Sequence, residues 1–254
     1  RPPRSTLFPY TTLFRSDNGG SYPFKLSEKL TEQLKELAQT EGATLYMTLL
    51  AAFQVLLYRY TGQEDILVGS PTSARTKAEF ASLVGYFVNS VVMRADLSGN
   101  LSFRDFLSQV RQTVLGALAH QDYPFALLVD KLQLERDSSR APLFQAYFVL
   151  QKFLESQDVP KDFFSSKKTL MNWGGLEVEP FVLEQYESQY DLLLEMFEED
   201  SSLVGLLKYN ADLFDEQTIA RMAGHFQNLL EGIVNDPQQR VTALPLMTER
   251  SEER

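Results

Sequence analysis

The sequence predicts an α/β fold: one lobe in which a mixed β-sheet is flanked by helices. Apolar residues make up 44% of the 254 residues and aromatic residues 12%, which is enough to bury a sizeable core. Segments with helical periodicity alternate along the chain with short apolar runs that are typical of strands. Because the two kinds of element interleave along the sequence, a single layered α/β lobe is expected.

Two helices are expected near the N-terminus. Over 26–39, apolar residues recur every three or four positions, with Ser27 as the N-cap and Gly42 as the stop signal. A second helix is expected over 44–60. Its residues are apolar almost all round, so the sequence predicts a helix buried in the core.

The next part of the chain predicts two strands with a short helix between them. Residues 65–69 have the pattern of a short buried strand, and a helix is expected over 77–83. The apolar run over 85–94 predicts a second strand. It breaks strict alternation at Asn89-Ser90, which indicates burial on both faces or a bulge.

Two further helices follow these strands. Ser102 is the expected N-cap of the first, and Asp105 lies three residues on, as in a weaker form of the capping box. Apolar residues keep helical spacing from there to Leu118. Pro124 is expected at the first position of a second, shorter helix, where its missing N–H costs nothing.

The pattern changes to strands beyond residue 142. Strands are expected over 143–150 and 176–183, the second from alternating apolar residues. Residues 156–175 between them are polar and rich in turn formers, so a long loop is expected there.

The C-terminal part predicts a hairpin and a closing helix. Strands over 191–197 and 203–209 are expected to pair through a turn at 199–201. An amphipathic helix over 216–234, capped by Asp215, follows. After it the chain is expected to continue as an extended, charged tail.

Composition excludes several classes of function. The net charge of −10, from 24 basic and 34 acidic residues, argues against a nucleic-acid binder, which would carry a basic patch. No run of about 18 apolar residues appears, so no membrane span is expected. The lack of cysteine excludes disulfides, thiolate metal sites and a cysteine nucleophile, and is compatible with a cytoplasmic protein.

The first 16 residues differ in character from the rest. They contain three arginines and no acid, and they nearly repeat one tripeptide, at 6–8 and 12–14. Without them 21 basic and 34 acidic residues remain, a net charge of −13. This segment resembles translated sequencing-adapter text more than a targeting presequence. Residues 1–20 are therefore expected to be a non-native or disordered leader.

The residue types and their spacing, without any family resemblance, indicate no complete active site. His120 and Asp122 stand two positions apart, where such a pair could orient a general base or simply form local hydrogen bonds at a helix start. His225 lies in the last predicted helix and is expected to be a surface or partly packed side chain. Two isolated histidines do not supply a metal site, and neither a phosphate-binding glycine loop nor a Gly-x-Ser-x-Gly elbow is present.

Three segments together carry a resemblance to a known family. We name them the first, second and third motifs: Val84-Gly-Tyr-Phe-Val-Asn-Ser90 followed by Arg94, His120-Gln-Asp-Tyr-Pro-Phe125, and Arg136-Asp-Ser-Ser-Arg-Ala-Pro-Leu-Phe144. In this order and spacing they resemble the condensation domains of nonribosomal peptide synthetases. Supporting similarity lies at 63–69, 209–214 and 244–249, so the resemblance covers 21–254. It implies a condensation lobe over 21–240 and a linker towards an adenylation domain over 241–254.

The resemblance implies amide-bond formation in a two-lobed fold like that of chloramphenicol acetyltransferase. Donor and acceptor peptidyl carrier proteins present thioesters on phosphopantetheine arms from opposite ends of a tunnel, and no cofactor binds the domain directly. The family's His-His-x-x-x-Asp-Gly motif belongs to the N-terminal lobe and is absent here. The chain therefore resembles the C-terminal lobe only, inactive alone, with no catalytic residue to carry over. Its implied partners are the N-terminal lobe, the two carrier proteins and the adenylation domain, without nucleic acid or membrane.

Candidate site residues follow from the motifs. Asn89 would present its amide to the tunnel or bond to backbone at a bulge, and both interpretations stay open. Gly85 and Tyr86 are candidates for the tunnel wall, although Tyr86 and its neighbour Phe87 also suit the core, and Gly85 would permit close backbone approach. The remaining motif residues are expected to be structural, with Asp137 and Arg140 tying a loop by charge-assisted hydrogen bonds; they are His120, Asp122, Arg136, Asp137 and Arg140.

Alternatives remain at the level of function. The first and second motifs favour a peptide-forming domain, joining two L-residues, over an epimerising or heterocyclising relative. The chain would be a fragment of an elongation enzyme, a natural half-domain that binds carrier proteins without catalysis, or a related acyltransferase that esterifies an alcohol.

Overall fold

The structure is a computed structural model that describes residues 18–80, 82–133, 141–152, 171–173, 175–178, 188–199 and 201–247. Its centre is a six-stranded sheet in the order β1-β8-β7-β4-β2-β3. The strands are β1 (Gly19–Lys25), β2 (Asp65–Thr72), β3 (Asn89–Asp96), β4 (Ala146–Lys152), β7 (Leu192–Glu199) and β8 (Ser202–Asn210). β4 runs parallel to both of its neighbours, β2 and β7, whereas the other pairs are antiparallel. The predicted mixed sheet is thus confirmed.

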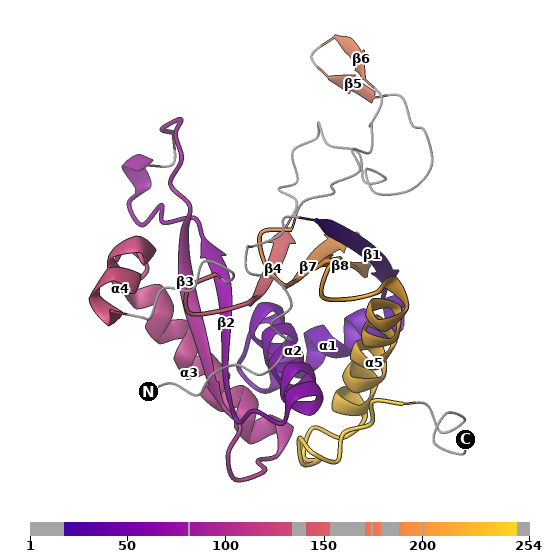
Figure 1. Ribbon diagram of the computed structural model, residues 1–254. Coiled ribbons are helices and arrows are strands. Elements are labelled where there is room, and N and C mark those ends of the chain that lie inside the picture. Colours follow the sequence, from indigo (N-terminus) through magenta and orange to yellow (C-terminus); the bar gives the residue numbers. More distant parts are fainter. Residues whose placement is uncertain are drawn as a thin grey trace.

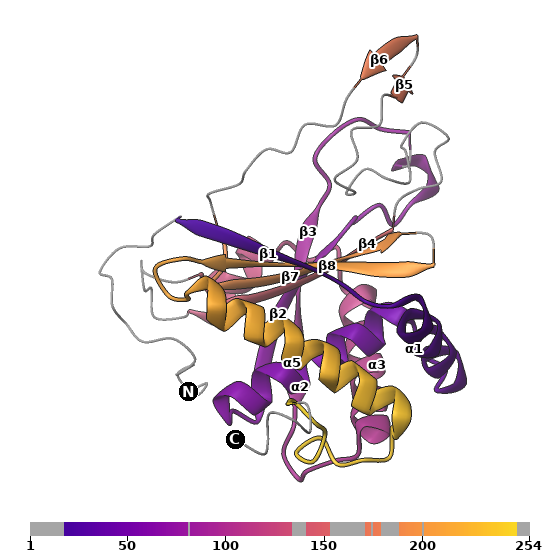
Figure 2. The ribbon, with the colours of Figure 1, turned by 90° about the vertical axis from the view of Figure 1, so that its right-hand side faces the viewer.

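Four helices cover one face of this sheet (Figures 1 and 2). They are α1 (Glu28–Thr40), α2 (Leu45–Thr61), α3 (Phe103–Ala119) and α5 (Glu216–Asn235). The short helix α4 (Phe125–Leu132) lies beyond the β3 edge, and a small ribbon of β5 (Met171–Trp173) and β6 (Leu176–Val178) projects away from the lobe (Figure 1). The architecture is a two-layer α/β lobe.

The predicted N-caps Ser27, Ser102 and Asp215 are confirmed, and Thr44 caps α2 in the same way, whereas Pro124 is the N-cap of α4 instead of its first helical residue. Ser27, Thr44, Ser102 and Asp215 each accept a hydrogen bond from the backbone N–H three residues on. Gly62 ends α2 in the left-handed region, at a φ of 68°, which glycine adopts without strain. α2 is the core helix that the sequence predicts, because every residue from Met47 to Leu57 is buried.

Strand β1 is missing from the elements that the sequence predicts. Gly19 and Gly20 fall in the expected leader, but they begin a strand that pairs with β8 along its whole length. The signal in the sequence is weak because only Tyr22 and Phe24 carry apolar side chains towards the core, and two glycines precede them. The rest of the expected leader, residues 1–17, lies outside the described residues.

The prediction for 77–88 is wrong. In place of a helix over 77–83 the structure has a single 3-10 turn, Ala78–Phe80, and β3 begins at Asn89 instead of Gly85. β3 pairs with β2 residue for residue, without a bulge, and its later residues alternate between buried and less buried positions. Only the first part of the apolar run that suggested burial on both faces differs from the prediction, because residues 85–88 lie in an exposed loop, in which Val84 and Tyr86 stand almost free of protein contacts.

The loop and tail predictions are also wrong in part. The long loop expected over 156–175 contains β5, and of the strand expected over 176–183 the structure describes only β6. The extended tail instead folds back onto the helices: Val241 and Leu244 are fully buried. The start of the expected linker over 241–254 therefore packs as part of the lobe, and 248–254 lies outside the described residues.

Candidate functional site

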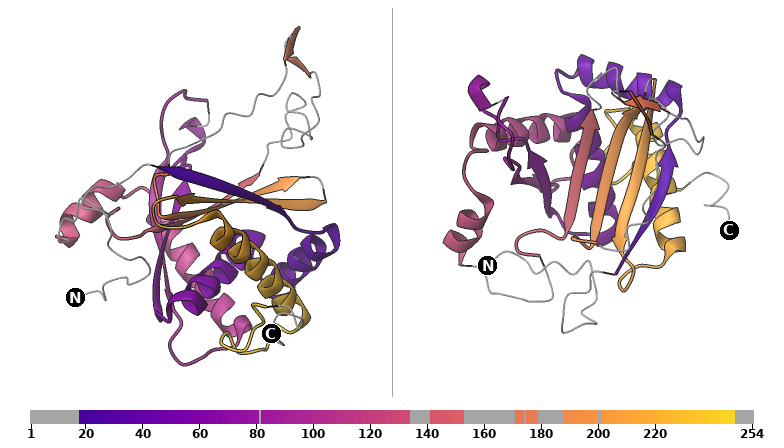
Figure 3. Two further views of the ribbon diagram at one scale, coloured as in Figure 1. Left: turned by 45° about the vertical axis from the view of Figure 1, so that its right-hand side comes forward. Right: turned by 90° about the horizontal axis from the view of Figure 1, so that it is seen from above.

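Among the described residues, no helix covers one face of the sheet (Figure 3). We call the side opposite α1, α2, α3 and α5 the helix-free face. Among its strand positions, polar and charged residues such as Arg94 and Lys208 stand beside apolar residues that are only half-buried. The apolar residues include Leu67, Val92, Val149, Leu193, Val204 and Leu206. A half-buried apolar sheet face of this kind is a surface suited to a partner.

A polar group interrupts the apolar surface of this face. Glu195 in β7 accepts a hydrogen bond from Gln151 Nε2 at 2.6 Å and pairs with Lys208 Nζ at 3.0 Å. Only 8% of Glu195 is exposed, so its charge needs these partners to offset the loss of hydration. Both carboxylate oxygens are engaged, and the group serves to hold β4, β7 and β8 together.

A second polar contact spans three strands at one end of the helix-free face. The Tyr147 hydroxyl in β4 lies 3.1 Å from the Ser90 hydroxyl in β3, and the strand between them, β2, places Gly69 beneath the Tyr147 ring. A Cβ atom on Gly69 would lie only 2.5 Å from Tyr147 Cδ2 and would also clash with the Phe144 ring. The missing side chain of Gly69 is therefore what allows Tyr147 to reach Ser90.

An aromatic cluster holds the Tyr147 ring in place. Tyr190 stacks on it with ring centroids 4.3 Å apart and planes within 5°. The Phe144 ring lies 5.8 Å from each of these tyrosines, and Phe125 at the start of α4 lies 5.3 Å from Phe144. Burial raises the pKa of the Tyr147 phenol, although the hydrogen bond to Ser90 opposes this shift.

Asn89 links the first and second motifs. Its side-chain Nδ2 donates to the carbonyl oxygens of Gln121 and Tyr123, both at 2.8 Å, and its Oδ1 accepts from the Phe125 N–H at 3.1 Å. The last bond satisfies a backbone N–H at the start of α4, where the N-cap residue Pro124 provides no side-chain cap. These bonds occupy both amide protons, so the amide fixes the loop before α4. They match the backbone-bonding interpretation of Asn89, but without the bulge.

His120 and Asp122 do not contact each other. His120 Nδ1 lies 2.9 Å from the Gly116 carbonyl oxygen of α3, whereas the Asp122 carboxylate accepts from the Thr76 hydroxyl at 3.3 Å. Both side chains are exposed. The His120 contact is local to the end of α3, whereas Asp122 bonds to Thr76, 46 residues earlier in the chain, and no oriented histidine base forms within the described residues.

Tyr86 and Gly85 lie on the loop between the 3-10 turn and β3. Tyr86 is 89% exposed, which excludes the expectation that it belongs to the core. Phe87 anchors the loop instead: the Arg75 guanidinium lies 4.2 Å from its ring centroid and the Phe80 ring 5.9 Å away. A side chain at Gly85 would approach the Phe87 ring to 3.2 Å, so close packing does occur there. Arg136, Asp137 and Arg140 lie outside the described residues.

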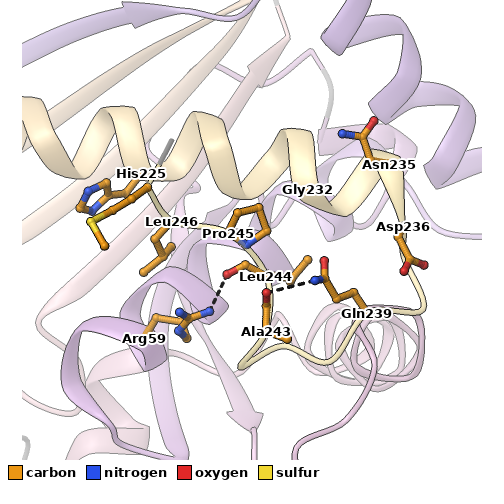
Figure 4. A pocket seen from close by; sticks show the side chains of 11 residues that line it. Arg59, His225, Gly232, Asn235, Asp236, Gln239, Ala243, Leu244, Pro245 and Leu246 are labelled. Atoms are coloured by element: carbon orange, nitrogen blue, oxygen red, sulfur yellow. Dashed lines mark hydrogen bonds between the residues drawn. The ribbon is translucent and has the colours of Figure 1, made fainter. Parts of the chain in front are cut away.

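A cleft of about 580 Å³ lies on the opposite side of the lobe, between α5, the end of α2 and residues 239–247 (Figure 4). On its wall Arg59 donates to the carbonyl oxygens of Val241 and Leu244, at 3.3 and 2.7 Å. His225 lies 2.7 Å from the Tyr60 hydroxyl, and burial lowers the pKa of the imidazole, with Arg221 adding to the effect. In this cleft the histidine thus pairs with a tyrosine hydroxyl and the arginine with backbone carbonyl oxygens.

The described ranges contain no group of three or more His, Asp or Glu side chains able to hold a metal ion. In the same ranges no single helix is long and apolar enough to cross a bilayer; α1 and α2 meet that criterion only as a pair, bent by 104°.

The contact of Tyr147 with Ser90 over Gly69, on the helix-free face, is not predicted from the sequence. Neither Tyr147 nor Gly69 stands out in the sequence, since one lies in an apolar strand and the other at the end of a predicted strand. An isolated glycine within a strand is a signal of close approach by another group, and in the structure β2 continues beyond Gly69 to Thr72.

Comparison with known proteins places this lobe in a family. The condensation domain family model matches residues 11–254. One of the linear gramicidin synthase proteins of Brevibacillus parabrevis is 47% identical over 235 residues, which cover 92% of this chain and 3% of that protein. Tyrocidine synthase 3 of the same organism is 40% identical over 240 residues, 94% of this chain and 4% of that protein. The chain thus spans a small part of the curated relatives it matches.

Solved structures show the same fold. A four-domain nonribosomal peptide synthetase bound to AMP and glycine superposes with a TM-score of 0.84 at 26% identity, covering 94% of this chain and 18% of that one. The X-domain from teicoplanin biosynthesis gives a TM-score of 0.77 at 25% identity, covering 93% of this chain and 51% of that one. With the family model matching almost the whole chain, this protein belongs to the condensation domain family.

Proposed function

We propose that this chain is the C-terminal lobe of a condensation domain that forms amide bonds between carrier-bound aminoacyl or peptidyl thioesters. The observation that carries the proposal is the set of half-buried apolar residues on the helix-free face of the sheet, in a chain that belongs to the condensation domain family. The share of the X-domain that the chain covers, 51%, supports the assignment to one of two lobes.

The reaction needs a base that this chain does not contribute. In the proposed step the acceptor amine attacks the donor thioester carbonyl, a C–N bond forms, the C–S bond breaks, and the thiol leaves with the proton that the amine loses. The family's histidine motif would accept that proton. The two histidines of this chain, His120 and His225, are not adjacent in sequence and match no part of that motif.

The helix-free face would form one wall of a cleft that a second lobe closes. Its apolar residues supply a surface to bury, and the loop bearing Val84 and Tyr86 extends the exposed apolar area beside it. Asn89 would contribute indirectly, by fixing the loop that precedes α4. In this arrangement Tyr86 and Gly85 stand at the rim of the cleft.

Phosphopantetheine enters this proposal as part of the substrate. Donor and acceptor carrier proteins would bring the thioesters to the cleft, and an adenylation domain would follow the C-terminal segment. The relatives named as gramicidin and tyrocidine synthases support this choice of partners. A carrier-binding half-domain without catalysis and an alcohol-esterifying acyltransferase are the competing assignments.

The proposal is tested by supplying the missing lobe. The chain is assayed alone and fused to the preceding lobe of a family member such as tyrocidine synthase 3, with loaded donor and acceptor carrier proteins, and the product is identified by mass spectrometry. Dipeptide from the fusion and none from the chain alone is the expected result. Dipeptide from the chain alone, an ester product, or carrier binding without product would each reject the proposal in favour of another assignment.

A further inference from the structure

The C-terminal segment that follows α5 is fixed to the lobe at several points. Its start is tied to the first turn of α3, where the Phe103 N–H donates to the Gln239 carbonyl oxygen at 3.0 Å. Its middle is held by the arginine at the end of α2, and two of its apolar side chains are buried. Near its end, Asn228 Nδ2 of α5 donates to the Leu246 carbonyl oxygen at 2.8 Å. The path of the chain is therefore set as far as Leu246.

The end of this segment runs along α5 towards the start of that helix (Figure 4). Pro245 lies over Gly232, where a Cβ atom would come within 2.6 Å of the Pro245 ring. Leu246 is bound one turn earlier on the helix, by Asn228. Successive residues of the segment thus meet successive turns of α5, and the missing side chain of Gly232 permits the close approach.

The last described residue continues in this direction. Met247 lines the cleft together with His225, which lies about one turn before Asn228 on α5. One turn before His225, the same face of the helix carries Arg221, because residues four apart are neighbours on a helix surface. The chain beyond Met247 is therefore directed towards Arg221.

Basic side chains gather where the chain leaves the cleft. His225 lies 2.7 Å from the Tyr60 hydroxyl of α2, and Arg59 precedes this tyrosine on the cleft wall. Burial lowers the pKa of His225 and raises that of Tyr60, and the charge of the nearby Arg221 adds to the first shift and opposes the second. The acidic residue among the described cleft residues, Asp236, lies at the opposite end of α5. The end of the cleft near His225 therefore favours a negatively charged group.

Arg221 has donors that the described part of the chain leaves unused. Its guanidinium carries five N–H donors, and the side-chain hydrogen bond that it forms there is to the Thr218 hydroxyl, at 2.8 Å. The charge of Arg221 also reaches Asp215, but that carboxylate caps α5 and accepts from the Thr218 N–H and hydroxyl. No carboxylate of the described residues lies within ion-pair distance of Arg221. Most of its N–H groups therefore remain for an acceptor from elsewhere.

The residues after Met247 contain a suitable acceptor. They read Thr-Glu-Arg-Ser-Glu-Glu-Arg over 248–254, with three carboxylates. Glu249 stands two residues beyond Met247, and two extended residues span about 7 Å. One turn of α5 spans about 5 Å. Glu249 is thus the acidic residue within reach of Arg221, whereas Glu253 stands four residues further on.

We propose that the face of α5 that bears Arg221 and His225 is the docking surface for residues 248–254, with Glu249 paired to Arg221. The planar guanidinium donates two parallel N–H bonds to one carboxylate, which fixes direction as well as distance. This surface lies on the helix-covered side of the lobe, so it is independent of the condensation reaction proposed above. Docking leads the chain away from the helix-free face and fixes the point at which any further domain is attached.

The test follows the Arg221 side chain in the intact chain by NMR. Its Nε–Hε resonance is identified by its loss in Arg221→Gln and is then compared in Glu249→Gln and Glu253→Gln. Each of the last two changes removes one carboxylate from the same segment, but only Glu249 is within reach. Glu249→Gln is expected to move the Arg221 resonance to its position in a chain that ends at Met247, and to speed hydrogen exchange of this N–H up to about fivefold. Glu253→Gln is expected to leave both unchanged.

A second readout separates docking from an effect of charge at a distance. Nitrogen relaxation of the Glu249 backbone amide should show the order of a folded segment, and Arg221→Gln should release it. Arg111→Gln, which removes an exposed arginine from α3, is the matched control and should leave this amide ordered. High salt should act like Arg221→Gln, since exposed ion pairs are screened. A Glu249 amide whose mobility is unchanged by Arg221→Gln, or equal shifts of the Arg221 resonance in Glu249→Gln and Glu253→Gln, would overturn the inference.

Discussion

The two faces of the sheet differ in how deeply this chain buries their apolar side chains and in how it pairs their hydroxyl groups. Beneath the helices, Leu194, Phe148 and Val68 are essentially inaccessible, and the Tyr46–Ser70 pair ends in a backbone carbonyl. On the helix-free face Leu67, Val92 and Leu193 are only half-buried, and the Tyr147 and Ser90 hydroxyls bond to each other. The difference teaches that one face supplies the packed core of the lobe, whereas the other keeps partly exposed apolar side chains.

The largest expected loss of stability is found by comparing two neighbouring residues of β7 that lie on opposite faces of the sheet. Leu194→Ala, beneath the helices, should lower the free energy of unfolding by about 2–5 kcal/mol, because it leaves a cavity in a packed core. Leu193→Ala, one residue away on the helix-free face, should cost about 1 kcal/mol or less in the isolated chain. Urea unfolding measures both, and equal losses would show that the two faces are equally packed.

The second comparison uses two arginines. Arg59, on the helix side, donates to two backbone carbonyls of the C-terminal segment, and Arg59→Ala should cost about 1.5–3 kcal/mol. Arg94 of the edge strand β3 forms a bidentate but largely exposed ion pair with Asp65, so Arg94→Ala should cost less than about 1 kcal/mol. Thermal unfolding measures the loss of stability in both variants. A larger loss in Arg94→Ala than in Arg59→Ala would mean that the C-terminal segment does not stabilise the lobe.

The third comparison uses two glycines. Gly69→Ala places a methyl group against the Tyr147 and Phe144 rings and should destabilise the chain by about 1–3 kcal/mol. Gly116→Ala on helix α3 meets no atom within 4 Å and should stabilise it by about 0.5–1 kcal/mol. Calorimetry measures both changes. A neutral Gly69→Ala would show that Tyr147 does not pack over β2.

The smallest effect is the pH dependence contributed by His225. Its pKa in the folded chain is lowered by burial, so below about pH 6.5 the unfolded chain binds a proton that the folded chain resists. Stability should therefore fall as the pH drops through that range, and His225→Gln should flatten this part of the profile. Melting temperatures from pH 7.5 to 5 measure the slope; a slope unchanged by His225→Gln would assign the pH dependence to other groups.

Sequence patterns predict the helix-covered side well and the helix-free side poorly. Caps at Ser27, Thr44, Ser102 and Asp215 are local signals, and α2 is apolar all round, so these elements follow directly from neighbouring residues. The hairpin of β7 and β8 also follows from its alternating pattern and turn.

The errors have physical causes. The loop before Asn89 is predicted as a strand because exposed apolar residues such as Val84 and Tyr86 look the same in sequence as core residues. The Tyr147–Ser90 contact joins three strands that are distant in the chain, and only the sheet order brings them together. The C-terminal segment has the pattern of a tail because its burial depends on Arg59, more than 180 residues away.

Closure of the helix-free face by a second lobe is the central proposal for this protein. Methyl NMR of leucine-labelled chain, titrated with the preceding lobe of a family member, reports each side of the sheet separately. Resonances of Leu67, Leu193 and Leu206 should shift on binding while those of Leu192 and Leu194 stay in place. Shifts confined to the resonances of residues beneath the helices, or no binding at all, would contradict the proposal of a second lobe.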